Sequence, residues 1–188
     1  MAEGSKLTGK RVLLLGAETD LGSAIAAALA EAGARLALVG ATNDAETAFA
    51  VQRLARKLGA EASQAIDATN EMAVRVMVRQ VSKALGGLDG IVRASPSTIE
   101  FDQFQQLLRS LSLLIRLGGR ELTRSGGKHL IAIQPDGSQG LGISWGSGTL
   151  IQIERPAPQW EMTAVSVGKR RAEEVATEVV AALAAPAS

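Results

Sequence analysis

The chain has 188 residues, a net charge of +1 at pH 7 and a mean hydropathy of +0.14, which suit one soluble globular domain with its own core. This near-zero net charge excludes a broad positive potential that would attract nucleic acid or an anionic membrane. The lack of cysteine excludes disulfides and thiolate chemistry. With one histidine, His129, the chain lacks the usual ligands of a zinc site, and a surface position is expected for that histidine.

The first ten residues, MAEGSKLTGK, lack the apolar region of a signal peptide. No apolar run approaches the roughly 18 residues of a membrane span. We therefore expect a cytoplasmic protein.

The first half of the sequence alternates between short apolar strands and helices. Strands are predicted at Val12–Leu15, Arg35–Val39, Ala62–Ile66 and Gly90–Val92, and helices at Leu21–Ala32, Asn43–Leu58 and Asn70–Leu85. Asp20 is the expected N-cap of the first helix, and Asn43 or Asp44 that of the second. In the third helix, Met72, Val76 and Leu85 are expected on one apolar face, with Val81 near them. This βαβ order with short connections predicts a parallel sheet covered on both faces.

The second half is less regular. A long helix with a wide apolar stripe is predicted over Phe101–Thr123, followed by a strand at His129–Ile133. After the glycine-rich run DGSQGLGISWGSGT, strands are predicted at Thr149–Arg155 and Trp160–Val167, and a closing helix over Lys169–Ala184. The last residues, 186–188, are expected to fray. We find no internal repeat and no linker between domains.

Residues 12–26, VLLLGAETDLGSAIA, place Gly16 and Gly22 in the first strand-to-helix turn. In a doubly wound sheet this turn lies at the carboxyl ends of the strands, where a helix N-terminus offers N–H groups to a pyrophosphate. Two glycines are a weak signal by themselves, and the same residues serve equally well in a purely structural turn.

The segment LTGKRVLLLGAETDLGSAIAAALAEAGARLALVG resembles the opening strand, glycine turn, helix and second strand of the short-chain dehydrogenase/reductase family. ASQAIDATN, GGLDGIVRASP and FDQFQQLLRSLSLLIRLGGRELTRSGGKHLIAIQ resemble its later strands and long interface helix. The resemblance covers about residues 7–135, and residues 136–168 are atypical. It implies an α/β, Rossmann-like, doubly wound and mostly parallel sheet in a single domain over 1–188, with an atypical strand pair in place of the usual catalytic helix.

The resemblance also implies a site for NAD or NADP, with departures that point to weak or absent binding. The implied cofactor-binding residues are Gly16, Glu18, Thr19, Asp20, Leu21, Gly22, Gly40, Asp67 and Ala94. Asp20 stands at the middle glycine of the family's turn, and its carboxylate is expected to compete with a phosphate. Gly40-Ala41 offers neither the family's acidic residue for NAD nor its basic residue for NADP.

The family's catalytic Asn, Ser, Tyr and Lys have no counterparts here. By spacing, Asn falls near Leu111 and Ser near Pro135, with Ser138 as a displaced substitute. The Tyr-Lys pair falls in Gly146–Thr149, and the chain contains no tyrosine at all. No catalytic residue and no metal ligand is therefore assigned.

Other candidate residues have ordinary structural explanations beside the functional ones. Trp145 and Trp160 could flank a ligand, although buried packing is the commoner role. The cluster Lys169–Arg171 is expected to face solvent. Arg93 could meet a phosphate at the carboxyl edge of the sheet.

These observations predict a non-catalytic member of this fold that acts as a nucleotide-binding or assembly subunit, with an active relative as a candidate partner. The implied interface is residues 101–122, in a homo-oligomer or in a heteromer with a related subunit, without nucleic acid or membrane. The alternative is an NAD(P)-dependent oxidoreductase with relocated catalytic residues, and a third option is a nucleotide sensor that binds without reacting.

Overall fold

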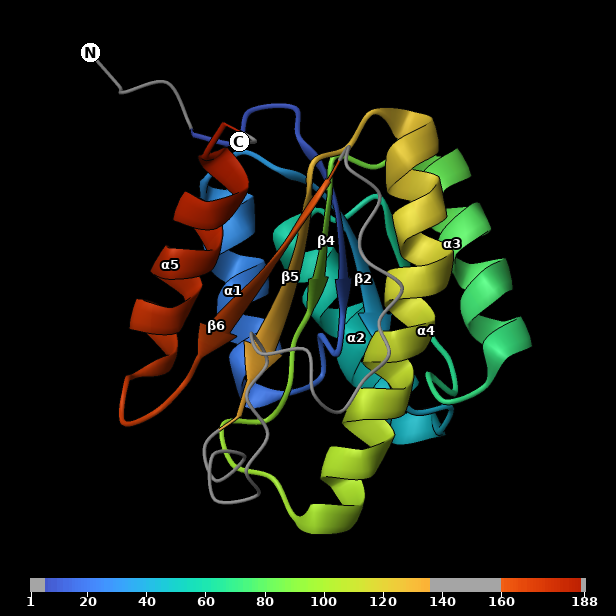
Figure 1. Ribbon diagram of the computed structural model, residues 1–188, viewed down its shortest axis with the longest axis vertical. Helices are drawn as coiled ribbons and strands as arrows, with labels where there is room; N and C mark the ends of the chain where they lie inside the picture. The colour runs from blue at the N-terminus through green and yellow to red at the C-terminus, as the bar shows by residue number, and fades with distance from the viewer. Residues whose placement is uncertain (1–5, 136–159, 187–188) are drawn as a thin grey trace.

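The computed structural model describes residues 6–135 and 160–186, which form one parallel sheet with helices on both faces (Figure 1). The strands are β1 (Arg11–Leu15), β2 (Arg35–Gly40), β3 (Ala62–Ala65), β4 (Gly90–Arg93), β5 (His129–Gln134) and β6 (Glu161–Ser166). The helices are α1 (Asp20–Glu31), α2 (Ala45–Leu58), α3 (Glu71–Leu85), α4 (Phe101–Ser125) and α5 (Ala172–Ala184).

The six strands lie in the order β3-β2-β1-β4-β5-β6, and every pair is parallel. This order is that of the doubly wound dinucleotide-binding fold. The chain leaves β1 toward β2 on one side and returns through β4 on the other, so the switch point lies between β1 and β4. The α/β class, the parallel sheet and the single Rossmann-like domain expected from the sequence are confirmed.

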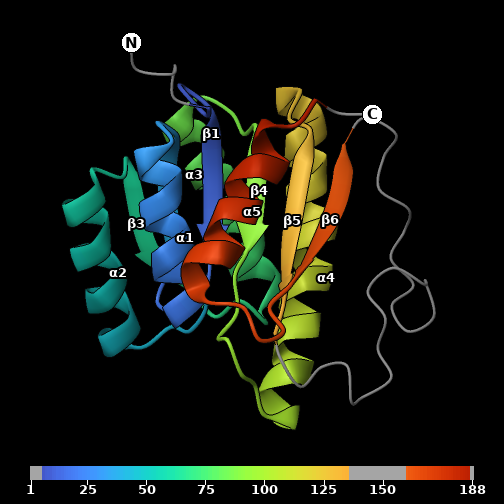
Figure 2. The ribbon, with the colours of Figure 1, turned by 90° about the vertical axis from the view of Figure 1, so that its left-hand side faces the viewer.

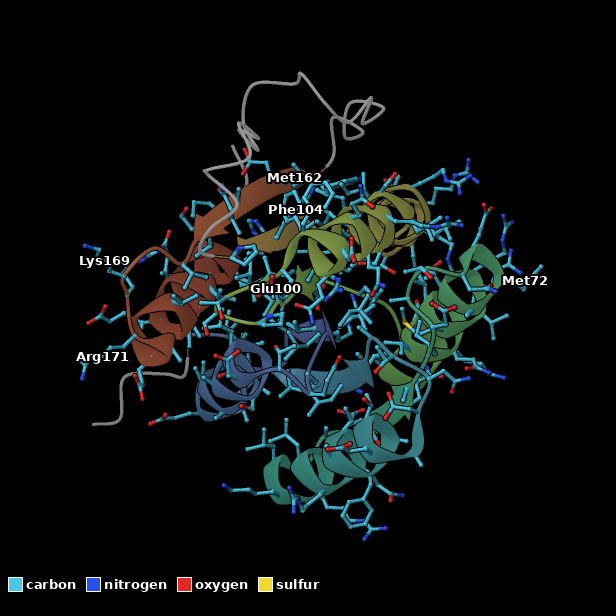
Figure 3. All side chains as sticks on the ribbon, turned by 90° about the horizontal axis from the view of Figure 1, so that it is seen from below. Met72, Glu100, Phe104, Met162, Lys169 and Arg171 are labelled. Atoms are coloured by element: carbon cyan, nitrogen blue, oxygen red, sulfur yellow. The ribbon has the colours of Figure 1, made fainter. Side chains whose placement is uncertain are left out.

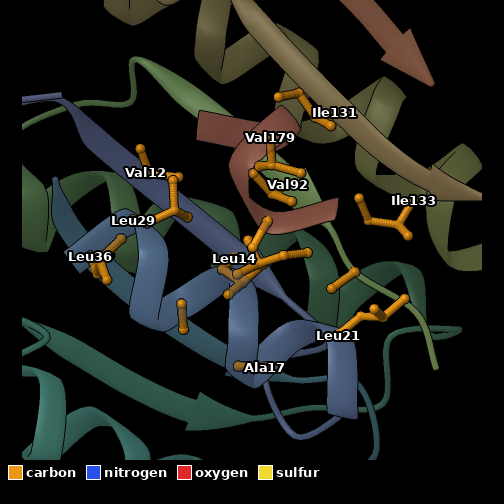
Figure 4. Close-up of a cluster of buried hydrophobic side chains, with 14 of the residues drawn as sticks. Val12, Leu14, Ala17, Leu21, Leu29, Leu36, Val92, Ile131, Ile133 and Val179 are labelled. Carbon is orange, nitrogen blue, oxygen red and sulfur yellow. The ribbon is translucent and has the colours of Figure 1, made fainter. Parts of the chain in front are cut away.

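Two apolar clusters hold the layers together, one on each face of the sheet. Helices α1, α2 and α5 cover one face and α3 and α4 the other (Figure 2). Figure 4 shows the first cluster, in which Leu14 and Val92 of the sheet meet Leu21 and Leu29 of α1 and Val179 of α5. Because side chains alternate along a strand, Leu13 and Ile91 point into the opposite cluster. The central strands are thus buried on both faces, as in other parallel sheets.

The N-cap of the first helix differs from the one predicted from the sequence. Thr19, rather than Asp20, is the N-cap of α1, and its Oγ1 accepts a hydrogen bond from the N–H of Gly22 at 2.9 Å. Asp44 caps α2 by accepting from the N–H of Thr47 at 2.8 Å, one of the two caps expected there. Asp20 is the first residue of α1, so its carboxylate is free to bond elsewhere.

The apolar face of α3 also differs from the prediction. Met72 and Val76 are 65% and 44% exposed, and Figure 3 shows Met72 on the outer side of the helix. The buried residues of this face are Val74, Met77, Val78, Val81, Ser82 and Leu85. The face is therefore offset from the predicted one, and only Val81 and Leu85 belong to both.

His129 and Trp160 are both buried. The Nε2 of His129 lies 3.0 Å from the carbonyl oxygen of Ala185 at the end of α5, so the expected surface position is wrong. Trp160 packs over Gly119 of α4, which fits the structural explanation. The predicted strand at Thr149–Arg155 and Trp145 lie outside the described residues. The cluster Lys169–Arg171 is exposed, as predicted.

A charged pair joins the start of β1 to the turn before β4. Asp89 accepts from the backbone N–H and the Nε of Arg11 at 2.8 and 2.9 Å, and from its Nη2 at 2.9 Å. The hydrogen bond from the Arg11 side chain is the main cause that lowers the pKa of Asp89 from its ordinary 3.8. A lowered pKa in the folded state means that this stabilisation is complete above the ordinary pKa and is lost as the pH falls through the folded value.

We predict that Asp89→Asn lowers the free energy of unfolding by about 1 kcal/mol at pH 7, because a charge-assisted bidentate pair becomes a neutral one. The difference in the free energy of unfolding between the variant and the wild type should shrink as the pH falls below about 4. Urea unfolding followed by circular dichroism at both pH values measures the effect. Glu61→Gln, which breaks the more exposed pair with Arg35, is the control and should cost less; a larger loss there would contradict the assignment.

Candidate functional site

The candidate site lies at the carboxyl edge of the sheet, where β1 and β4 end side by side. Leu15 of β1 pairs with Arg93 of β4, and the two chains diverge directly after this pair. Figure 3 looks onto this edge, with Glu100 and Phe104 marking the start of α4. In open parallel sheets, ligands bind in the crevice at such a switch point.

The turn from β1 to α1 is built on two close approaches of the backbone. A Cβ atom on Gly22 would lie 2.0 Å from the carbonyl oxygen of Gly16, so any side chain there would push α1 away from the strand. Gly16 has a φ of +94°, and a Cβ on it would lie 2.6 Å from the carbonyl oxygen of Ala94. Both glycines are therefore required by packing within the chain, whether or not a ligand binds.

The turn uses several of its own N–H groups. The N–H groups of Gly16 and Ala17 donate to the carbonyl of Val39, and that of Thr19 donates to the carbonyl of Gly16. The Gly22 N–H donates to its cap, Thr19 Oγ1. Asp20 and Leu21 open α1, so their N–H groups have no partner inside the helix and point to the N-terminal end, where an anion is favoured.

Asp20 links this turn to the loop after β4. Its Oδ1 accepts from the N–H of Ser97 at 3.0 Å and its Oδ2 accepts from the hydroxyl of Ser97 at 2.5 Å. The predicted competition for the helix N–H groups is thus wrong in its detail, because Thr19 takes that role. The carboxylate instead spans the crevice between the β1 and β4 ends, which we call the Asp20–Ser97 bridge.

Arg93 lies buried beneath Gly16. Its Nε donates to the hydroxyl of Ser110 on α4 at 2.9 Å, and its Nη1 donates to the carbonyl of Ala94. A Cβ on Gly16 would lie 2.6 Å from that Nη1. Burial lowers the pKa of Arg93 to about 10, so the side chain stays charged at pH 7. Because the guanidinium is enclosed, it does not meet a ligand directly, but its charge lies directly under the turn.

Glu18 reaches from the same turn to the end of β2. Its Oε1 accepts from the N–H of Ala41 at 3.0 Å, while its Oε2 is buried and has no hydrogen-bond partner among the described residues. The negative charge of Glu18 raises the pKa of Arg93, although burial outweighs it. The site therefore holds one buried cation and one carboxylate with an unsatisfied oxygen.

The remaining predicted residues lie along the same edge. Ala94 is fully buried at the end of β4, where its N–H donates to the carbonyl of Leu15. Gly40 ends β2. Asp67 is exposed after β3; the hydrogen bond from the Thr69 hydroxyl at 2.7 Å is the main cause that lowers its pKa. Ser97 and Ser110 carry no signal in the local sequence, because their partners Asp20 and Arg93 lie on other elements.

The positions where the resemblance places catalytic residues provide no proton donor in the described part of the chain. Leu111 is completely buried in the cluster between α4 and the sheet. Pro135 follows β5. Asp136, Ser138 and the window Gly146–Thr149 lie outside the described residues. Within the described residues, no group of three or more His, Asp or Glu side chains could hold a metal ion, and no helix is long and apolar enough to cross a membrane.

Comparisons with known proteins agree with this architecture. The family model of enoyl-(acyl carrier protein) reductase matches residues 16–105, and none of the curated proteins matches the chain. A short-chain dehydrogenase from Mycobacterium smegmatis is 21% identical, with a TM-score of 0.71 over 95% of this chain and 87% of its own. A metagenomic short-chain oxidoreductase in complex with NADP is 22% identical, with a TM-score of 0.71 over 97% of this chain and 94% of its own.

Other matches cover less of the relative. A short-chain type dehydrogenase/reductase from Mycobacterium marinum is 28% identical over 68% of this chain and 56% of its own, with a TM-score of 0.54. This chain thus spans about half the length of that protein. The sheet order, the glycine turn at the switch point and the matched segment lead to one conclusion: the chain has the fold of the short-chain dehydrogenase/reductase family.

Proposed function

We propose that this protein is a non-catalytic member of its family that binds a nicotinamide dinucleotide weakly and acts as a binding or assembly subunit. The observation that carries this proposal is the combination of a built glycine turn with a chain that contains no tyrosine. An oxidoreductase of the same fold with relocated catalytic residues is the alternative.

Three features of the carboxyl edge support binding of a dinucleotide. The N–H groups of Asp20 and Leu21 stand at the start of α1, where a phosphate is favoured. The buried charge of Arg93 lies under Gly16 and adds to the positive potential there. The carboxylate of Glu18 at the end of β2 is suited to accept hydrogen bonds from a sugar. If a dinucleotide is bound, it would supply the hydride chemistry, while the N–H groups of Asp20 and Leu21 would hold its phosphates and Glu18 its ribose.

The Asp20–Ser97 bridge supports weak affinity. A pyrophosphate at the start of α1 would lie near the Asp20 carboxylate, and like charges repel. The bridge would also have to open for a ligand to enter the crevice between the β1 and β4 ends. Affinity would then fall both through repulsion and through the cost of two broken hydrogen bonds.

Two variants separate these contributions. Asp20→Asn removes the charge while its side-chain oxygen can still accept from Ser97, and Ser97→Ala removes one hydrogen bond while the charge stays. We expect NADH to bind the wild type with a Kd above about 100 μM, and both variants to bind about three- to tenfold more tightly. Calorimetry and nucleotide fluorescence give the Kd values.

Ser23→Ala is the matched control, since its hydroxyl donates to the carbonyl of Asp20 and leaves the bridge intact. Its Kd for NADH should equal that of the wild type. Low-micromolar binding by the wild type, or weaker binding by Asp20→Asn, would contradict the account.

The absence of tyrosine from the sequence supports the non-catalytic assignment. Carbonyl reduction needs an acid within about 3 Å of the substrate oxygen, and a positioned acid or base contributes about 10²–10⁴-fold to the rate. The family's acid is a tyrosine, and this chain has none. His129 lies at the amino end of β5, at the opposite edge of the sheet from the glycine turn.

We therefore expect no oxidation of NADH or NADPH by the purified protein with ketones, aldehydes or quinones at high protein concentration. Turnover that survives repurification and is abolished by Ser138→Ala or Asp136→Asn would favour relocated chemistry. Turnover that appears only on mixing with an active family member would support the subunit role.

The proposed interface is residues 101–122, which lie in α4, in a homo-oligomer or with a related subunit. Most of the apolar stripe of this helix is already buried within the chain: Leu111 and Leu114 are fully enclosed, and Leu113 and Leu117 are 9% and 8% exposed. Phe101, which is 57% exposed at the start of α4, is the large apolar side chain left for a partner on this helix.

Phe101→Asp is the test of this interface, because Leu111→Asp or Leu114→Asp would disrupt the core instead. We expect the wild type to elute as an oligomer in gel filtration with light scattering, and Phe101→Asp to shift it toward the monomer. Phe49→Asp is the matched control: it changes a ring on α2 that is 65% exposed and should leave the mass unchanged. A wild-type monomer at high micromolar concentration would remove the homo-oligomer.

A further inference from the structure

We propose that Glu18 makes this site selective for a ribose with a free 2′-hydroxyl, so that NAD(H) is bound in preference to NADP(H). This inference rests on the proposed function, because it specifies which dinucleotide the site takes. It assigns the selection to a residue of the glycine turn, and not to a residue at the end of β2.

The position of the Glu18 carboxylate carries the first step. In a doubly wound sheet, the 2′-hydroxyl of the ribose is bound by an acidic side chain about 20 residues after the glycine turn, at the end of the second strand. Here that position is Gly40, and a Cβ on it would lie 2.4 Å from Cγ2 of Thr47 and 3.3 Å from Cγ2 of Val51. Helix α2 therefore leaves no room for an acidic side chain on Gly40.

Glu18 brings a carboxylate to the same place from the other side. Its Oε1 accepts from the N–H of Ala41, the residue that follows β2. This hydrogen bond spans 23 residues of sequence and fixes the carboxylate beside the strand end. The acid that the second strand lacks is thus supplied by the turn.

The second step is the charge around the strand end. Residues 40–47 contain two acidic residues, Asp44 and Glu46, and no lysine or arginine. A 2′-phosphate would carry a charge of about −1.5 to −2 at neutral pH and would meet carboxylates. Arg93 makes no direct hydrogen bond to such a phosphate, since its guanidinium is buried and donates to Ser110 and Ala94. A 2′-phosphate is therefore repelled at this end of β2.

The third step is the unsatisfied oxygen. The Oε2 of Glu18 is buried without a hydrogen-bond partner among the described residues, and a carboxylate oxygen in such a place costs free energy until a donor reaches it. A ribose diol provides two neutral hydroxyl donors, whereas a 2′-phosphate provides acceptors. A carboxylate accepts from hydroxyl donors and repels a phosphate, so the same group attracts one ribose and repels the other.

The test uses probes that carry no nicotinamide, so its readout does not depend on turnover. ADP-ribose and its 2′-phosphate are titrated by calorimetry into the 188-residue wild type and Glu18→Gln. The glutamine oxygen can still accept from Ala41, so the turn should keep its shape, which the thermal unfolding midpoint checks. We expect the wild type to bind ADP-ribose at least about tenfold more tightly than its 2′-phosphate.

In Glu18→Gln this ratio should fall below about threefold, mainly because the 2′-phosphate binds more tightly. Glu31→Gln is the matched control: it removes the same charge from the exposed last residue of α1, at the end of that helix away from the turn, and should change the ratio by less than about twofold. NADH and NADPH should follow the same order by fluorescence.

The outcomes separate this inference from the proposed function. Comparable binding of both probes to the wild type, or an unchanged ratio in Glu18→Gln, would overturn the role of Glu18 while leaving dinucleotide binding in place. Failure of the wild type and both variants to bind either probe or either dinucleotide at millimolar concentration would overturn both.

Discussion

The buried guanidinium of Arg93 holds together the elements at the end of the sheet that carries the candidate site. It donates to Ser110 of α4 and to the carbonyl of Ala94, and it lies against Gly16 of the turn that opens α1. Burying a charge is costly unless its donors are used, and the lowered pKa of about 10 expresses that cost. In exchange for this cost, one side chain contacts β4, α4 and the glycine turn and fixes their relative positions.

The two carboxylates of the turn near Arg93, those of Glu18 and Asp20, bind different parts of the chain. Glu18 is close enough to Arg93 to raise its pKa, yet its hydrogen bond goes to Ala41 at the end of β2. The carboxylate of Asp20 instead accepts two hydrogen bonds from Ser97, in the loop after β4. The turn therefore contacts the loops that follow both neighbouring strands, one through each carboxylate. An anion at the start of α1 would meet a favourable helix end and a buried cation, but also these two acids.

Much of the fold was predictable from local sequence patterns. Apolar runs of strand length, capped helices and glycines after helix ends gave the order of elements through β5, because these signals act within a few residues. The offset face of α3 shows the limit: Met72 and Val76 fit a helical period, but which side meets the sheet is decided by packing against α4 and β2. His129 is similar, since its burial depends on Ala185 at the far end of the chain.

The site was predictable in its residues but not in its contacts. The resemblance located the turn from Gly16 to Gly22, whereas the partner of Asp20 lies 77 residues away and that of Glu18 lies 23 residues away. No local pattern encodes such pairs. Spacing alone assigned Asp20 to the helix N–H groups, while Thr19, one residue earlier, has the extended backbone that a cap requires.

The two glycines illustrate why a motif alone does not establish a function. A Cβ atom on either glycine would lie less than 3 Å from backbone atoms of the chain. A relative that had lost every ligand would therefore still need both glycines to keep α1 against β1 and β4. The side chains beside them are not constrained in this way. Glu18 leaves a buried oxygen unsatisfied, and a residue chosen only for stability would avoid that cost. The functional information at this edge therefore resides in the carboxylates of the turn, whose positions the glycines make possible.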